Sequence, residues 1–470
     1  MSKIDITSLL KVHHSSIEGG VLVPSHEGAA FQDLFIAVKD DFSIKENTMS
    51  GKSTAGLWGR IFDYHYGKVP LVENFLESTS VWKSSYTGEL IPEVDMKEWV
   101  EQTVRKILPH INSKSRVLEV GCGNGLILKG IKDHLGYYIG LDSSAQTIKK
   151  LKKLFNEVED NRNIQFYLHD AIDINNLLED SFDFVIVNSV IQYFGSTENL
   201  LSFINKLRYK LSLGAMIYFG DVRSYEHREF FYWGILMNRF KGQKIAVAQL
   251  KQHLKSLSSN EKETLYSIEL FKALPLFYHW IKGIRLDLRR GVVVNEMNQF
   301  RFDVFISSSN RVMESESITR IEWNENLRFK VAGSMSPVVV HRIPNHRILS
   351  LVKSYDSFLG LKDDEFFEFI QASPSNDSYD FSKDALQSSD DSIDVFWDDK
   401  HGNYHIMIKN PSDYCWTNVG FDFSKSSNSP TNKIVNEEFV RKLRQALPLH
   451  EFKNVFLVSQ DLFEIIKKFS

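Results

Sequence analysis

The chain has 470 residues, of which 43% are hydrophobic, and a formal net charge of −4. This length predicts two or three domains with enough apolar residues for buried cores. The mild acidity gives no electrostatic reason to expect a nucleic acid or a membrane surface as a partner. No apolar run reaches the roughly 20 residues that cross a bilayer, and no secretion signal is apparent, so we expect a cytoplasmic protein.

Cysteine and histidine usage excludes two further classes of protein. The only cysteines, Cys122 and Cys415, lie far apart, so neither a disulfide framework nor a zinc cluster is predicted. The histidines show no ligand spacing, and we expect no metal centre. We interpret Cys122 as a small apolar filler rather than as a nucleophile.

The first third of the chain changes character twice. Residues 1–57 carry few periodic signals, and no structure is assigned to them. Residues 96–108 place six apolar side chains on one helical stripe. Between 115 and 222, apolar strands alternate with helical or polar segments, which predicts a parallel sheet with helices on both faces. The predicted strands are "RVLEV", "YYIGLD", "IQFYLHD", "FDFVIVN" and "AMIYFGD".

The second half predicts a cap, a closing hairpin and an appendage. Residues 224–282 are helical in pattern and rich in aromatic side chains, and we expect them to cover a substrate pocket. "GIRLDLRRG" (283–291) and "RFDVFISS" (301–308) indicate an antiparallel pair that closes the sheet. Beyond residue 310 the chain is more polar, and the short strands "IDVFWDD" and "YHIMIKN" predict a small α+β appendage over 311–470.

The sequence "VLEVGCGNGL" (117–126) joins an apolar strand to a helical pattern through three closely spaced glycines. Bare backbone at such a place lets a ligand approach the N-terminus of a helix. The dinucleotide fingerprint G-x-G-x-x-G does not fit, because Leu126 occupies the position of its third glycine. The Gly-Lys-Ser/Thr ending of a P-loop is missing as well, so NAD and ATP are both disfavoured.

"EVGCGNG" (119–125) resembles the first motif of class I S-adenosylmethionine-dependent methyltransferases. The resemblance implies an acidic residue that ends the second strand and accepts the ribose hydroxyls, and Asp142 stands 21 residues after Gly121. It also implies an adenine contact where Asp170 and Ala171 follow the third strand. The residues that it assigns to the cofactor, S-adenosylmethionine, are Glu119, Gly121, Cys122, Gly123, Gly125, Asp142, Ser143, Asp170, Ala171, Asn188 and Ser189.

The same resemblance implies an α/β fold of the Rossmann-like class I methyltransferase type. We therefore expect a mostly parallel, seven-stranded sheet over residues 58–310, with an N-terminal helical lid and a helical cap at 224–282. The α+β appendage would follow at 311–470.

Five further motifs make the resemblance more specific. They are "WKSSYTGELIP" (82–92), "NSVIQYF" (188–194), "GDVRSY" (220–225), "NEMNQFRFDV" (295–304) and "RIPNHRI" (342–348). In this order they resemble the methyltransferase domains embedded in the adenylation domains of nonribosomal peptide synthetases. Those domains N-methylate aminoacyl thioesters held on a carrier protein. Neither an adenylation core nor a carrier-protein serine motif is found in this chain, so we expect a freestanding relative.

The resemblance implies methylation of an amine in specialised metabolism. The acceptor would be an amine-bearing small molecule, or an aminoacyl or peptidyl group on a carrier protein or synthetase. We expect Glu296 and Asn295 at a turn between the two closing strands, where Glu296 would accept an ammonium proton or orient the amine. On residue type alone, Glu296 would instead be an exposed glutamate that caps backbone amides. The other candidates are Tyr86 and Tyr193 for catalysis, and Gln192, Asp221 and Arg223 for substrate binding.

Two alternatives and one structural prediction accompany this reading. The nucleophile could be an oxygen or a carbon of a free small molecule, or the chain could be a non-catalytic protein that docks on a synthetase. The intact "EVGCGNG" motif, Asp142 and Asp170 argue against the non-catalytic alternative. Arg301 and Asp303 are predicted to form a structural ion pair or network.

Overall fold

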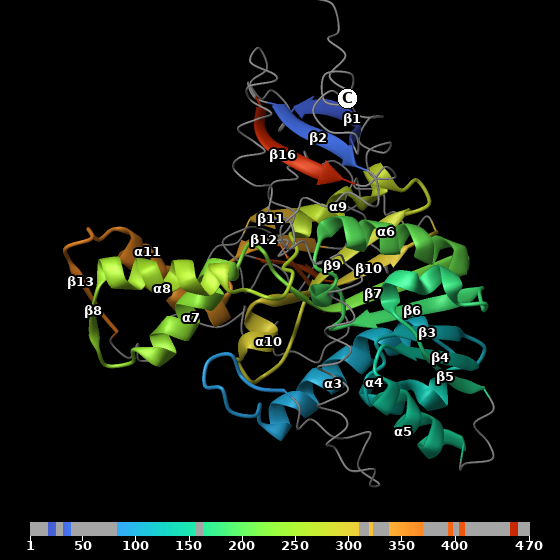
Figure 1. Ribbon diagram of the computed structural model, residues 1–470. Helices are drawn as coiled ribbons and strands as arrows, with labels where there is room; N and C mark the ends of the chain where they lie inside the picture. The colour runs from blue at the N-terminus through green and yellow to red at the C-terminus, as the bar shows by residue number, and fades with distance from the viewer. Residues whose placement is uncertain are drawn as a thin grey trace, which may run out of the picture.

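The computed structural model describes residues 17–24, 32–38, 82–156, 163–309, 319–322, 338–369, 393–397, 404–408 and 452–458. Within these ranges the chain forms a layered α/β body around a large sheet, and a helical cap that projects from it (Figure 1). Among these residues, no helix is long and apolar enough to cross a membrane.

Seven strands of the sheet lie in the order β9-β10-β7-β6-β3-β4-β5. They are β3 (Arg116–Val120), β4 (Tyr137–Asp142), β5 (Ile164–Leu168), β6 (Phe182–Asn188), β7 (Leu211–Arg223), β9 (Gly283–Leu288) and β10 (Arg301–Ser307). Strands β3 to β7 run parallel, whereas β10 pairs antiparallel with both β7 and β9. The predicted parallel strands and the closing antiparallel pair are thus confirmed. Strands β3 and β6 are covered on both faces, and all of their residues except Arg116 and Asp183 are buried.

Helices cover both faces of this sheet and build two separate cores. One face carries α3 (Glu93–Ile107), α4 (Leu126–Ile131) and α5 (Ala145–Asn156), and the other carries α6 (Thr197–Leu207) and α9 (Ile268–Phe277). In α5, Ile148, Leu151 and Phe155 are buried while the lysines between them face solvent, as the helical periodicity predicts. Short 3-10 turns complete the connections at Leu108–His110, Lys132–His134, Ala171–Asn176, Ile191–Tyr193 and Arg208–Lys210.

The helical cap is assembled from two stretches of chain that are far apart in sequence. Its elements are α7 (Arg228–Arg239), β8 (Lys244–Ala246), α8 (Val247–Ser259), α11 (His346–Leu359) and β13 (Phe366–Glu368). At its centre the buried Trp233 ring stacks on Phe358, with ring centroids 4.6 Å apart, and its indole Nε1 donates to Ser354 (3.1 Å). The predicted cap at 224–282 therefore lacks α11, and it includes α9, which packs on the sheet.

The large sheet continues beyond β9 through β14 (Ile393–Trp397), β15 (Tyr404–Ile408), β12 (Val338–Ile343) and β11 (Thr319–Glu322), which gives 11 strands in all. The two short strands expected after residue 390 are present, but they extend the main sheet. A second sheet joins β1 (Ile17–Pro24), β2 (Gln32–Val38) and β16 (Phe452–Val458), and its first two strands lie in the N-terminal segment to which the sequence assigned no structure. Cys415 and the predicted loop at 371–391 lie outside the described residues.

Candidate functional site

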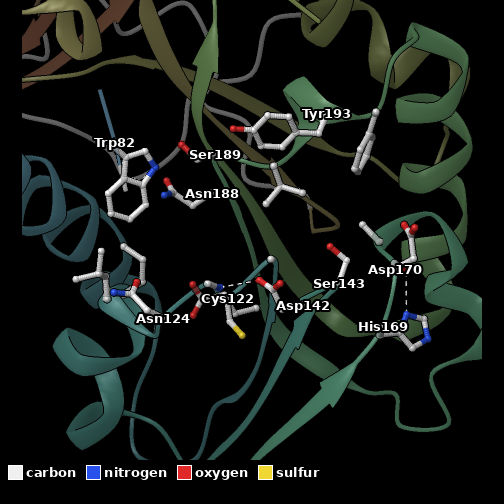
Figure 2. Close-up of a pocket in the computed structure, with 18 of the residues that line it drawn as sticks. Trp82, Cys122, Asn124, Asp142, Ser143, His169, Asp170, Asn188, Ser189 and Tyr193 are labelled. Atoms are coloured by element: carbon white, nitrogen blue, oxygen red, sulfur yellow. Dashed lines mark hydrogen bonds between the residues drawn. The ribbon is translucent and has the colours of Figure 1, made fainter. Parts of the chain in front are cut away.

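The glycine-rich loop lies at the carboxyl edge of the sheet, between the end of β3 and the start of α4. Gly121 and Gly125 have positive φ angles of 74° and 83°, and Gly125 is the N-cap residue of α4. A Cβ added at Gly121 would lie 2.3 Å from Val190 Cγ2. Only glycine combines this conformation with this close approach. The bare loop leaves a pocket above it (Figure 2).

Asp142, the last residue of β4, fastens this loop. Its carboxylate accepts hydrogen bonds from the backbone N–H of Gly123 (2.9 Å) and of Ser144 (2.8 Å). A carboxylate has about four acceptor positions, so the same group can also accept from the hydroxyls of a bound ligand. Ser143, beside it, lines the pocket (Figure 2).

Glu119 lies beneath the loop and is only 2% exposed. Its Oε2 accepts a hydrogen bond from the Tyr138 hydroxyl (2.6 Å). Burial raises the pKa of Glu119 to about 8, against the lowering effect of that hydrogen bond, and the nearby carboxylate of Asp142 raises it further. The buried acid can therefore hold a proton near neutral pH and would ionise beside a cationic ligand.

The other end of the pocket is formed by the turn after β5. The Asp170 side chain caps the turn that starts at Ala171 by accepting from the backbone N–H of Ile172 (3.0 Å). His169 also lines the pocket, and its Nδ1 lies 2.8 Å from the backbone oxygen of Asp170 (Figure 2). Sequence reasoning missed His169 because a single histidine after a strand carries no spacing signal.

Asn188 and Ser189 end β6 and line the same pocket. The buried Oδ1 of Asn188 has no hydrogen-bond partner within the described residues, so it lacks the donor that a buried acceptor requires. Together with the glycine loop and the carboxylates of Asp142 and Asp170, this acceptor fits a ligand with several hydroxyl or amine donors. The residues present therefore fit S-adenosylmethionine.

Two tryptophans line the pocket opposite the glycine loop. Both belong to residues 82–107, the segment that ends with α3 and that we call the N-terminal lid. Trp82 and Trp99 have ring centroids 6.4 Å apart, and Trp99 comes from α3. Trp99 was interpreted from the sequence only as part of an apolar helical stripe. Its indole Nε1, however, donates to Asp221 Oδ1 (3.0 Å), which ties the lid to the sheet.

Asp221, predicted to contact the substrate, is a buried junction of hydrogen bonds. It is 1% exposed, and its φ of 62° is rare for a residue with a side chain. Besides Trp99, its carboxylate accepts from Ser189, Arg289 and Arg301. Such strain persists where the surrounding contacts demand it, and it is common at functional sites.

The predicted ionic network around Arg301 and Asp303 is present, with an unexpected connectivity. Arg301 pairs with Asp221, whereas Asp303 pairs with Arg289 (3.1 Å) and Lys106 (2.6 Å). Arg289 links the two halves, because it also contacts Asp221 (3.3 Å). Burial alone would raise the pKa of Asp303, but Arg289 and Lys106 hold it below its usual value.

The expected turn between β9 and β10 is a short helix, α10 (Glu296–Gln299), and this corrects the predicted setting of Glu296. Asn295 caps that helix and also donates to Asp95 Oδ2 (3.0 Å). Glu296 is 5% exposed, and its carboxylate accepts from the backbone N–H of Ser85 (3.0 Å). Glu296 is therefore buried against the lid, and it lines a second cavity instead of the cofactor pocket.

Of the four remaining candidates, one lines each of these two places and two line neither. Tyr193 lines the cofactor pocket (Figure 2). Arg223 lines the second cavity. Tyr86 packs on Phe231 (ring centroids 6.2 Å apart) with its hydroxyl on Gln299 (3.3 Å), and Gln192 is buried with its Oε1 unpartnered in the described chain.

Residues 118–217 match the sequence family described as "Methyltransferase domain". This stretch begins in β3, ends in β7, and contains the glycine loop, Asp142 and Asn188. Together with the strand order, the match defines the class: the chain contains an S-adenosylmethionine-dependent methyltransferase domain. Three or more histidine, cysteine or acidic side chains placed to hold a metal ion are not found in the part of the chain that is described.

Its sequence relatives are parts of much longer proteins. The chain is 30% identical over 244 residues to chondramide synthase cmdD of Chondromyces crocatus, which covers 52% of this chain and 6% of that protein. It is 28% identical over 348 residues to the nonribosomal peptide synthetase TES of Alternaria alternata, covering 70% of this chain and 7% of that protein. The chain thus spans less than a tenth of either relative's length.

Similarity to solved structures is weak. The N-methyltransferase NodS from Bradyrhizobium japonicum is 16% identical with a TM-score of 0.32, covering 45% of this chain and 95% of that one. Phosphoethanolamine N-methyltransferase 1 of Haemonchus contortus is 13% identical with a TM-score of 0.36, covering 55% of this chain and 50% of that one. The class assignment does not rest on these values.

Proposed function

We propose that this protein transfers a methyl group from S-adenosylmethionine to the amine of an aminoacyl or peptidyl substrate held on a carrier protein or synthetase. The observation that carries the methyl transfer is the pocket over the glycine loop. Its lining combines the carboxylates of Asp142 and Asp170, the unpartnered amide oxygen of Asn188, and the rings of Trp82 and Trp99. The choice of an aminoacyl acceptor is supported by relatives that are named as nonribosomal peptide synthetases.

The chain's own residues have three tasks in such a transfer. When bound, the cofactor supplies an electrophilic methyl group on a sulfonium sulfur. Asp142 and the glycine loop hold the ligand in place, and positioning of this kind lowers the barrier to an in-line displacement. Trp82 and Trp99 keep water out of the reaction, which prevents hydrolysis and strengthens the charge interactions inside the pocket.

The acceptor nitrogen must be unprotonated when its lone pair attacks the methyl carbon. As the new C–N bond forms, the C–S bond breaks and its electron pair returns to sulfur. The nitrogen is left with a proton to lose. We assign Glu296 to orienting the amine and receiving this proton, Asn295 to holding α10 in position, and Tyr193 to closing the pocket wall.

The test is a methyl-transfer assay with the purified chain. Aminoacyl N-acetylcysteamine thioesters and carrier-bound aminoacyl thioesters would be offered with S-adenosylmethionine, and tandem mass spectrometry would locate the added methyl group. Methylation of the amine nitrogen supports the proposal. Methylation of oxygen or carbon, or no transfer to any of these acceptors by protein that binds the cofactor, contradicts it. Glu296→Gln should lower kcat at least tenfold while leaving S-adenosylhomocysteine binding unchanged.

A further inference from the structure

A second cavity lies between the cap, the lid and the end of the sheet. Its volume is about 380 Å³, within the range of roughly 300–1,000 Å³ that small-molecule sites occupy. Its walls come from the lid at Ser85, the end of β7, the cap helices α7 and α8, the loop before α9, and the α10–β10 segment. None of these residues lines the cofactor pocket.

One wall of this cavity is apolar. It is formed by Phe231, Ile235, Leu257, Leu265 and Phe300. Phe231 and Phe300 contact each other with ring centroids 5.5 Å apart. Leu257 is half-buried on α8, so its side chain limits the cavity without being locked in the core of the cap. Such a wall favours an uncharged hydrocarbon side chain.

The other residues that line the cavity are polar, and Arg223 among them lies over the Phe231 ring, with its Cζ 5.0 Å from the ring centroid. Arg223 contacts Glu261 (2.9 Å) and Glu263 (2.7 Å), and the Tyr232 hydroxyl donates to Glu261 (3.3 Å). Burial would lower the pKa of Arg223, but the two glutamates raise it, so its charge is retained. The charge of Arg223 is thus already paired, so this residue carries no strong preference for an ionic side chain.

One buried carboxylate, that of Asp221, is hydrogen-bonded to a residue of each of the two sites. Ser189, in the cofactor pocket, and Arg301, in the cavity, both donate to Asp221 Oδ2. Arg301 has five N–H donors, and its only side-chain hydrogen bond within the described residues goes to Asp221. Glu296 lines the same cavity. A molecule seated in the cavity can therefore reach Arg301 and Glu296 with its polar groups.

We propose that this second cavity binds the methyl acceptor, that its apolar wall receives an uncharged apolar aminoacyl side chain, and that Arg301 donates a hydrogen bond to the acceptor's carbonyl oxygen. The proposal rests on the proposed function, because it names the acceptor of that reaction. It predicts selectivity by side-chain size and polarity, set by residues outside the methyltransferase sequence match, which ends at residue 217.

The first experiment places a larger side chain on the apolar wall, so that the cavity is filled. Leu257→Trp should raise KM for the phenylalanyl N-acetylcysteamine thioester at least tenfold, and KM for the glycyl thioester less than threefold. KM for S-adenosylmethionine should stay unchanged. The matched control is Leu213→Trp, because Leu213 is fully exposed at the start of β7. Should Leu257→Trp fail to fold, Ile235→Phe fills the cavity from α7. An unchanged KM for the phenylalanyl thioester, relative to the wild type, in a folded filled variant would overturn the proposal.

The second experiment tests Arg301. Lysine retains a positive charge beside Asp221 but lacks the planar fork, so Arg301→Lys should raise KM about fivefold for glycyl and phenylalanyl thioesters alike. The dissociation constant of S-adenosylhomocysteine, measured by calorimetry, should remain within twofold of the wild-type value. An unchanged acceptor KM in this variant would overturn the assigned role of Arg301.

A binding measurement separates failure of this inference from failure of the proposed function. L-phenylalaninamide and glycinamide would be titrated into protein saturated with S-adenosylhomocysteine. Methyl transfer by the wild type with no effect of cavity filling overturns the inference alone. Absence of methyl transfer, together with phenylalaninamide binding that Leu257→Trp abolishes, overturns the acceptor chemistry but supports the cavity as the binding site. Neither transfer nor binding overturns both.

Discussion

The cofactor pocket and the second cavity are neighbours, yet they are built in opposite ways. Every residue that lines the cofactor pocket, except Trp82 and Trp99, lies between residues 119 and 194. The second cavity takes its walls from segments spread between Ser85 and Arg301. A site formed by consecutive β-α units leaves a local motif in the sequence, whereas a site assembled from distant segments does not. The difference explains why the cofactor was predictable from the sequence and the acceptor site was not.

The forces that hold the two regions also differ. The cofactor loop is held by hydrogen bonds from backbone N–H groups to Asp142 and to the Leu141 carbonyl. The boundary with the second cavity is held by the buried charges of Asp221, Arg289 and Asp303. A paired buried charge adds little net stability, but breaking the pair is costly. The following experiments exploit this difference.

The largest expected effect on stability concerns the buried charges between the cofactor pocket and the second cavity. Arg289→Met removes the cation that joins Asp221 to Asp303, and should lower the free energy of unfolding by about 3–5 kcal/mol. Urea denaturation measures this change. The matched control is Arg342→Met, which breaks an exposed pair with Glu322 and should cost less than about 1 kcal/mol. Equal losses in the two variants would show that burial of the network is irrelevant.

The next effect is on the cofactor pocket. Asp142→Ala removes an acceptor for ligand hydroxyls and releases the backbone N–H of Gly123. Two charge-assisted hydrogen bonds at about 1.5 kcal/mol each correspond to roughly a hundredfold loss in affinity for S-adenosylhomocysteine. Calorimetry measures the loss, with Asp133→Ala as the control at an exposed aspartate. Unchanged affinity for S-adenosylhomocysteine in a folded Asp142→Ala protein would show that Asp142 does not bind the ligand.

A smaller effect concerns the pH dependence of stability. The pKa of Glu119 is about 8 in the folded protein and 4.5 in the reference state. A raised pKa contributes stability that is fully present below 4.5 and is lost as the pH rises through 8. The wild type should therefore lose on the order of 1 kcal/mol per pH unit within this window.

The control for this prediction is Glu119→Gln, in which the titrating group is absent. Its melting temperature should be less dependent on pH between 5 and 8 than that of the wild type. Parallel pH profiles for the two proteins, followed by circular dichroism, would contradict the assignment of the buried proton to Glu119.

The smallest effect is expected at the lid. Trp99→Phe keeps an aromatic ring but loses the hydrogen bond to Asp221, and should weaken S-adenosylhomocysteine binding about three- to tenfold. Trp280→Phe is the control, because the Trp280 indole N–H has no hydrogen-bond partner within the described residues. If both variants bind equally well, the Trp99–Asp221 contact does not hold the lid over the pocket.

The elements that the sequence predicted best are those with a strong local pattern. "FDFVIVN" is β6 in full, and "RVLEV" and "YYIGLD" match β3 and β4, because a strand covered on both faces is apolar at most of its positions. Helix α10 was missed because its four residues are too few to show a hydrophobic period. The predicted cap lacked α11 because this helix lies about a hundred residues further along the chain. It joins the cap only through tertiary contacts such as Trp233–Phe358.

By itself, the amino-acid sequence determined the class of the domain, its cofactor loop, and the acids Glu119 in β3 and Asp142 at the end of β4. These features depend on the order of neighbouring residues, since a turn without side chains and an acid at a strand end are local requirements. Only the tertiary structure decided that Glu296 is buried against the lid, that Asp221 joins two cavities, and that the cap includes α11. Each of these depends on which distant surfaces pack together, and that is set by burial and charge pairing across the whole fold.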